Sequence, residues 1–110
     1  ANPDMVGHTG DFSAAVNACE VVDECLSKLI TSSIENNYTI IVIADHGNSD
    51  MMINDDGSPN TAHTTNPVPI ILVDKKIKKI SNGILADIAP TILKVLDLEI
   101  PSEMNGKVLI

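Results

Sequence analysis

Apolar and small residues recur every three or four positions after Phe12. This spacing is typical of an amphipathic helix with one buried face. Asp11 or Ser13 can cap the first turn, and the pair Asn36 and Asn37 can end the helix. The pattern therefore predicts one long helix, whose buried stripe is formed by Ala15, Val16, Cys19, Val22, Leu26, Leu29 and Ile30.

Two short runs of consecutive apolar residues predict strands. The β-branched run from Tyr38 to Ala44 is typical of a strand that is covered on both faces in a parallel sheet. A second buried strand is predicted over residues 67–73. Its prolines, Pro67 and Pro69, confine the start of this strand to an edge or first-residue position. The polar stretch 48–65 between the two runs is predicted to be a loop, with a turn at residues 54–57.

A second helix is expected near the end of the chain. Asp87 is predicted to cap it, and Pro90 is tolerated in its first turn. Its apolar side consists of Ile88, Ile92, Val95 and Leu96. The predicted order of helix, strand, loop, strand and helix indicates an α/β fold. Two strands do not make a stable sheet in water, so we expect residues 1–110 to be part of a larger sheet with mainly parallel strands.

The composition favours a globular protein with an acidic surface. With 44% apolar residues, the chain is expected to form one domain with a real core. A net charge of −8 argues against nucleic acid or an anionic membrane as a partner, and no apolar run is long enough for a membrane span. Cys19 and Cys25 would lie roughly 9 Å apart along a helix, too far for a disulfide. We therefore expect reduced thiols and a cytoplasmic protein. Because Ala1 stands directly against a motif, we also expect a piece of a longer protein or a processed chain.

The basic residues are seven lysines without any arginine. Since bidentate arginine is the usual clamp on phosphate or carboxylate, this chain alone is a poor candidate for binding such a substrate. Four lysines crowd into residues 75–79. An anion patch is one interpretation of this run, but a solvated connector after a strand is favoured because no glycine-rich loop or aromatic residue stands beside it.

All three histidines stand in short sequences suited to metal binding. His8 follows Asp4 by four residues, His46 follows Asp45 directly at the end of the first predicted strand, and His63 lies among small hydroxyl residues. Pro3 and Gly7 favour a loop around Asp4. For each histidine alone, a packing or solvated role is the simpler interpretation. For all three with two aspartates, an imidazole and carboxylate site for Zn²⁺, Mn²⁺ or Fe²⁺ is favoured.

Four blocks of the chain closely resemble the C-terminal part of the cofactor-independent phosphoglycerate mutases of the alkaline phosphatase superfamily. The blocks are Ala1 to Gly10, Ala44 to Asn48, Thr61 to Pro69 and Gly83 to Thr91, and the tail Glu103 to Lys107 matches as well. The resemblance implies a partial alkaline-phosphatase-like three-layer sandwich. It also implies interconversion of 3-phosphoglycerate and 2-phosphoglycerate through a phosphoserine intermediate.

The resemblance implies two Mn²⁺ ions, for which Co²⁺ or Zn²⁺ could substitute. Asp4, His8 and His63 are similar to the ligands of one ion, and Asp45 and His46 to two ligands of the other. The family's serine nucleophile and substrate-binding cations belong to a segment that precedes these motifs, so no catalytic residue is assigned here. The isolated chain is expected to be inactive and could self-associate through its exposed sheet.

The chain departs from the family where Ser49 and Asp50 replace the usual small residue and glutamate. This keeps the charge on a shorter arm and puts its reach in question. Ser49 is expected to be an ordinary loop serine rather than a substitute nucleophile. Two alternatives remain open: a related metallophosphomutase such as a phosphopentomutase, and a metal-binding module without catalysis.

Overall fold

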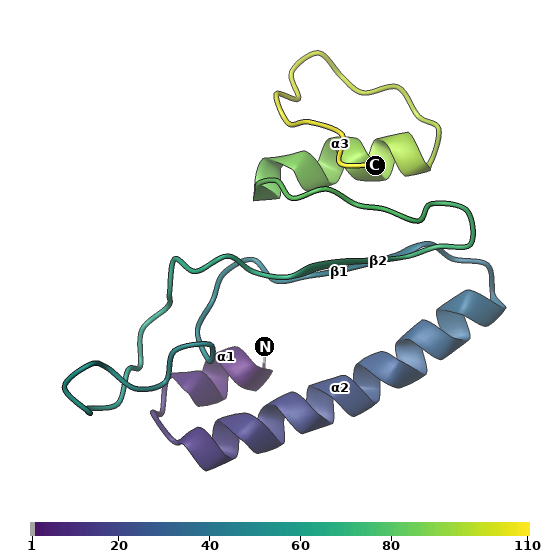
Figure 1. Ribbon diagram of the computed structural model, residues 1–110. Helices are drawn as coiled ribbons and strands as arrows, with labels where there is room; N and C mark the ends of the chain where they lie inside the picture. Colours follow the sequence, from purple (N-terminus) through teal and green to yellow (C-terminus); the bar gives the residue numbers. More distant parts are fainter. Residues whose placement is uncertain (1) are drawn as a thin grey trace.

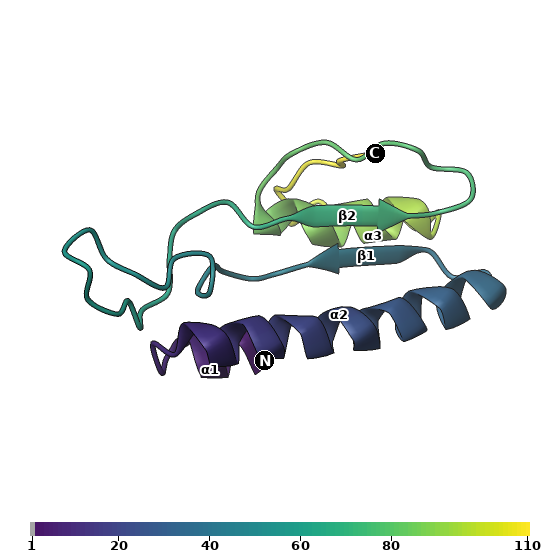
Figure 2. The ribbon, with the colours of Figure 1, turned by 60° about the horizontal axis from the view of Figure 1, so that its bottom comes forward.

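The computed structural model describes residues 2–110, and Ala1, the first residue of the first block, lies outside the described residues. The strand pair lies between a long helix on one side and a short helix on the other (Figures 1 and 2). The elements are α1 (Asn2–Gly7), α2 (Phe12–Glu35), β1 (Ile40–Ile43), β2 (Ile70–Val73), the 3-10 turn η1 (Leu85–Asp87) and α3 (Ile88–Val95).

The long helix α2 forms where the spacing of apolar residues predicts it. Asp11 caps its start, because its carboxylate accepts a hydrogen bond of 2.9 Å from the backbone N–H of Ala14. The helix ends before Asn36, and Asn37 takes a left-handed conformation with φ of 61°. The predicted buried stripe is wrong for this chain. Only Ala15 and Ala18 of α2 are buried, because the described residues leave most of the helix uncovered.

The two strands pair antiparallel, with Ile40 opposite Val73 and Ile43 opposite Ile70. The mainly parallel sheet is therefore not confirmed by this chain. Parallel neighbours need a crossover connection, usually a helix. The segment that joins β1 to β2 contains no helix and returns to the same end of β1 (Figure 2). Although helices lie on both sides, the strands remain partly exposed within residues 2–110, with Ile43 37% and Ile71 50% exposed, so the predicted cover on both faces of β1 is incomplete.

The first motif is a helix rather than the predicted loop. Pro3 stands in the first turn of α1, where its missing N–H costs no helical hydrogen bond. The backbone N–H of His8 donates to the carbonyl of Asp4 over 3.2 Å and continues the last turn. Asp4 and His8 consequently share one face of α1, as residues four apart on a helix do.

Asp87 stands at the start of α3 but does not cap the helix with its side chain. Its buried carboxylate accepts from the backbone N–H groups of Ile84 at 2.8 Å and Lys107 at 2.7 Å. These two bonds lower the pKa of Asp87. The Thr91 hydroxyl also accepts a hydrogen bond of 3.0 Å from the backbone N–H of Leu109. The C-terminal segment is thereby fixed along α3.

The expected core is small. Within residues 2–110, the buried apolar residues are Ala15, Ala18, Met52, Pro90 and Leu109. The radius of gyration is 16.6 Å, whereas a compact chain of this length has about 13 Å. Cys19 and Cys25 are free, as predicted. None of the helices within residues 2–110 has the length and apolarity needed to cross a membrane.

Hydrogen bonds to Asp74, which follows β2, connect it to Thr39, which precedes β1. These bonds predict that the stability of the folded chain depends on pH. The Thr39 hydroxyl, followed by the backbone N–H groups of Ile77 and Lys76, donates to the carboxylate and lowers the pKa of Asp74 to about 2 from an ordinary 3.8. A depressed pKa stabilises the folded state above the unfolded pKa, and this stabilisation is lost as the pH falls from about 4 through about 2. The Asp74→Asn variant should therefore show a flatter unfolding profile across that window. An NMR titration should give the wild-type carboxyl a midpoint near 2, and a midpoint near 3.8 would contradict the assignment.

Candidate metal centre

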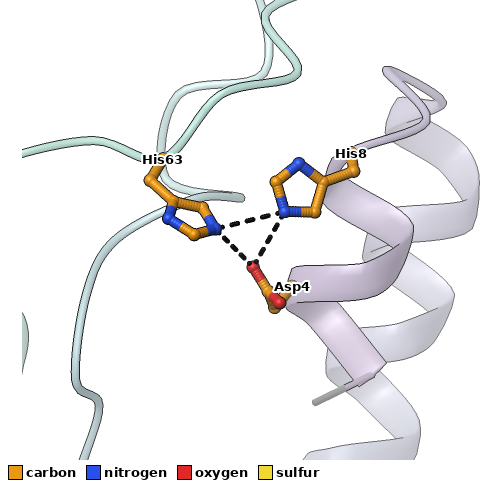
Figure 3. A group of neighbouring side chains, drawn as sticks. All are labelled: Asp4, His8 and His63. Atoms are coloured by element: carbon orange, nitrogen blue, oxygen red, sulfur yellow. Dashed lines mark hydrogen bonds and ion pairs between the residues drawn. The ribbon is translucent and has the colours of Figure 1, made fainter.

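Asp4, His8 and His63 converge on one point from α1 and from the loop before β2 (Figure 3). The Oδ1 atom of Asp4 lies 3.3 Å from Nε2 of His8 and 3.2 Å from Nε2 of His63. The two Nε2 atoms lie 3.1 Å apart. These three atoms form a nearly equilateral triangle, so one ion could contact all of them.

The triangle fits a first-row divalent ion in size and in donor type. A tetrahedral ion with nitrogen and oxygen ligands at about 2.0–2.1 Å holds its ligand atoms about 3.3–3.4 Å apart. The observed edges of 3.1 to 3.3 Å are close to that value. Two imidazoles with one carboxylate suit zinc, manganese, cobalt or iron better than calcium or magnesium, which prefer oxygen ligands only.

A backbone carbonyl orients the His8 ring. Nδ1 of His8 lies 2.6 Å from the carbonyl oxygen of Thr61. A carbonyl oxygen only accepts, so Nδ1 carries the hydrogen and the lone pair of Nε2 points into the triangle. Such a carbonyl behind a ligating histidine is a common arrangement at metal sites. It also connects α1 to the segment that carries His63.

The His63 segment is held in place by a short antiparallel bridge. The backbone N–H of Thr64 donates to the carbonyl of Gly47 over 2.8 Å. A Cβ at position 47 would lie 2.2 Å from the Thr64 hydroxyl, so this close approach requires glycine. The bridge places the residue that follows His63 beside the residue that follows His46.

Asp45 and His46 lie beside the triangle and do not complete it. The His46 ring stacks on the His63 ring with centroids 3.8 Å apart and planes inclined by 21°. Nε2 of His46 lies 3.7 Å from Oδ1 of Asp45, and the Asp45 side chain is 85% exposed. The structure therefore brings three of the five predicted ligands together and leaves the other two as an adjacent pair.

Asp45 and His46 also border a cleft of about 810 Å³ between the β1 end and the turn before α3. Thr64, Thr65 and Asn66 line its polar part. Ile43, Ile70 and Leu109 contribute to its apolar part. The side of the pair that faces away from the triangle is consequently open to further groups.

The segments that carry the five candidate ligands contain no lysine or arginine. The lysine-rich run 75–79 follows β2 at the end of the strand pair opposite to Asp45 and His46. Lys75 donates to the Asn37 side chain, and Lys78 to the carbonyl of Asp74. This supports the interpretation of the run as a connector rather than an anion patch of the site.

Three polar residues after Gly47 reinforce the triangle, and the sequence drew attention to Ser49 and Asp50 but not to Asn48. Asn48 is buried and contacts Asp4 and His8. The Ser49 hydroxyl donates to the carbonyl of Pro3 over 2.8 Å, as suits a loop serine. The Asp50 carboxylate accepts from the Asn66 amide at 2.5 Å and from the Thr64 hydroxyl at 2.9 Å. The sequence signal for these roles was only their position directly after the Asp45 to Gly47 motif.

The short arm of Asp50 therefore ends on Thr64 and Asn66 rather than at the triangle. The Asn66 amide, and then the Thr64 hydroxyl, lower the pKa of Asp50 below its ordinary value. The Asp50 carboxylate thus ties the first part of the loop to Thr64 and Asn66, which follow His63. It can hold the geometry of the centre without contacting an ion there.

Comparison with known proteins places these features in a family. The model of the metalloenzyme superfamily matches residues 1–100. The 2,3-bisphosphoglycerate-independent phosphoglycerate mutase of Flavobacterium johnsoniae is 64% identical over 105 residues, which are 96% of this chain and 21% of the relative. That of Clostridium kluyveri is 56% identical in an alignment of 112 positions, which covers 100% of this chain and 22% of the relative. The chain thus spans about a fifth of the length of these curated relatives.

A solved structure of Leishmania mexicana phosphoglycerate mutase, obtained at low cobalt concentration, superposes with a TM-score of 0.84. It is 33% identical and matches 99% of this chain and 23% of its own length. The predicted α/β fold and the resemblance drawn from the four sequence blocks are both confirmed.

The Asp50 network predicts a local effect on the segment that carries His63. In the Asp50→Ala variant, the Thr64 hydroxyl and the Asn66 amide lose a charged acceptor, which costs about 1 kcal/mol after allowance for solvent exposure. Amide hydrogen exchange at Thr64 should then be about five-fold faster. Asp50→Glu keeps a carboxylate and should recover most of the protection. Unchanged exchange in Asp50→Ala would show that the Gly47 bridge holds the segment alone.

Proposed function

Because this chain belongs to the metalloenzyme superfamily, we propose that it forms the C-terminal part of the phosphatase-like domain of a phosphoglycerate mutase. The whole protein would interconvert 3-phosphoglycerate and 2-phosphoglycerate. The observation that carries this proposal is the triangle of Asp4, His8 and His63, with edges of 3.1 to 3.3 Å, in a chain 64% identical to part of such an enzyme.

Two divalent ions are proposed for the whole enzyme, with Mn²⁺ as the native metal and Co²⁺ or Zn²⁺ as substitutes. Asp4, His8 and His63 would hold the first ion. Asp45 and His46 would contribute to the second, whose other ligands we place outside this chain. The donor set of imidazole and carboxylate supports this choice of metals. The cobalt named for the Leishmania mexicana enzyme is consistent with it.

Bound ions of this kind supply positive charge that activates a hydroxyl nucleophile and neutralises a phosphoryl group. The residues of this chain prepare that environment. The Thr61 carbonyl holds the His8 ring so that Nε2 faces the ligand triangle. The Gly47 to Thr64 bridge brings His63 to the same point. No cation for a phosphate or carboxylate group stands in these segments.

We therefore propose that the serine nucleophile and the substrate-binding cations lie outside residues 1–110. Phosphoryl transfer from phosphoglycerate to that serine, and back to the other hydroxyl of the glycerate, would take place against the metal-binding face formed here. The isolated chain should be inactive. The free cysteines Cys19 and Cys25 agree with a reducing compartment, so we place the protein in the cytoplasm.

A chimera tests the proposed activity. This chain replaces the matching 21% of the Flavobacterium johnsoniae mutase, and conversion of 3-phosphoglycerate is measured with Mn²⁺. The chimera should be active, whereas residues 1–110 alone should show no turnover. Turnover of a phosphopentose instead of phosphoglycerate would favour a related phosphomutase. A folded chimera that binds metal without any turnover would favour a metal-binding module.

A metal titration tests the ligands of the first site. His63→Ala and Asp4→Asn should each lower Mn²⁺ affinity by more than about 100-fold, because losing a direct ligand costs more than losing an outer partner. Asp55→Asn, at the exposed tip of the loop turn, removes the same charge as Asp4→Asn and should leave affinity unchanged. Loss of all strong binding in His46→Ala, with binding retained in His63→Ala, would reverse the assignment of the two sites.

A further inference from the structure

We infer that Asn48 is a positioning residue of the metal centre, whose amide N–H fixes the Asp4 carboxylate for the ion. This inference rests on the proposed function, since it assumes that Asp4 is a metal ligand. Asn48 lies in the loop after β1, 44 residues from Asp4 in the sequence. Its side-chain amide contacts both Asp4 and His8 at the triangle.

Asn48 is buried to a degree that is unusual for a polar loop residue, with 6% of its surface exposed. Ser49 donates to the carbonyl of Pro3 over 2.8 Å and anchors the same loop to α1. A Cβ at Gly7 would lie 1.8 Å from Oδ1 of Asn48. The amide therefore lies directly against the backbone of α1, and only a glycine at position 7 leaves room for it.

The amide nitrogen has two neighbours in the triangle. Nδ2 of Asn48 lies 3.1 Å from Oδ1 of Asp4 and 3.4 Å from Nε2 of His8. The lone pair of His8 Nε2 is the one that an ion would take, and a ligated nitrogen accepts no hydrogen bond. The Asp4 oxygen has further lone pairs and can accept from Asn48 while it binds an ion. The bond from Asn48 to Asp4 is consequently the contact that survives metal binding.

The amide oxygen has no hydrogen-bond partner among residues 2–110 although it is buried. Rotating the amide by half a turn would not repair this, because Oδ1 would then face the Asp4 carboxylate oxygen at the 3.1 Å now occupied by Nδ2. Two acceptors at that distance repel each other. The orientation that leaves the oxygen alone is thus the one that donates to Asp4.

Two variants separate a donor to Asp4 from other roles. Asn48→Ala removes the donor, and Mn²⁺ affinity at the first site should fall about 10- to 100-fold, as is typical when an outer partner of a ligand is lost. Asn48→Asp keeps the shape but faces Asp4 with a second carboxylate, and its affinity should fall at least as far. Asn17→Asp, on the exposed surface of α2, adds the same charge and serves as the control.

The titrations are made on the 110-residue chain and repeated in the chimera described above, by calorimetry with Mn²⁺ alone. Binding that depends on His46 and the melting temperature without metal should both stay near wild type, which a merely structural role for Asn48 would not predict. Retained or tighter binding by Asn48→Asp would show that position 48 supplies a direct oxygen ligand and would overturn the inference.

The same titrations distinguish a failure of the proposed function from a failure of the role inferred for Asn48. If the wild-type chimera binds no Mn²⁺, the metal centre itself is refuted together with this role of Asn48. If the wild type binds and Asn48→Ala binds equally well, only the positioning role is refuted. A parallel fall in the metal-free melting temperature and in binding at both sites would also refute it, because Asn48 would then act through the fold as a whole.

Discussion

The candidate metal centre depends on the closure of the long loop between β1 and β2. The loop leaves the strand pair at Asp45, and its two ends meet again where the Gly47 carbonyl accepts from Thr64. Together with the bond from His8 to the Thr61 carbonyl, that bridge fixes the position of His63 relative to α1. The same loop carries Asn48 and Ser49, which dock on α1 through polar contacts. One closed loop thus fixes both the helix and the histidine that complete the triangle.

Polar contacts hold this region together, whereas most apolar side chains remain uncovered. Hydrogen bonds of 2.5 to 3.1 Å connect the segments around the triangle to one another. They include the bond between His8 and Thr61 and the bond between Asn66 and Asp50. Along α2 and the strands, residues such as Leu29 and Ile71 stay exposed. Burial of such side chains is normally the dominant stabilising term. Within residues 2–110, a well-connected site thus stands on a framework whose hydrophobic faces lack a cover, in a chain that spans about a fifth of the length of its curated relatives.

The sequence predicted the elements better than their surroundings. Apolar spacing and an aspartate cap located α2, and the β-branched run located β1, because both signals are local. The helix α1 was missed because Pro3 and Gly7 suggest a loop, although proline is well tolerated in a first helical turn. Strand direction was missed because a continuous apolar run indicates burial without naming the neighbouring strand. The stripe on α2 marks a surface suited to burial, and the structure shows that its cover does not come from residues 2–110.

The candidate ligands could be selected from the sequence, but their grouping could not. His8 and His63 are 55 residues apart, and no spacing rule indicates that their Nε2 atoms lie 3.1 Å from each other. The role of Asn48 could not be predicted either, because its bond to Asp4 and its unpaired buried oxygen are features of the three-dimensional structure. Recognition of the family supplied the grouping in advance, since a resemblance carries information about three dimensions that composition and periodicity lack.

The stacked rings of His46 and His63 connect the two groups of ligands physically. His63 presents Nε2 to Asp4 and His8, and one face of its ring to His46. A displacement of the His46 ring would therefore alter the packing against the ring that presents Nε2 to Asp4 and His8. The ring stack and the Gly47 to Thr64 bridge therefore connect the triangle to the pair of Asp45 and His46 through one loop.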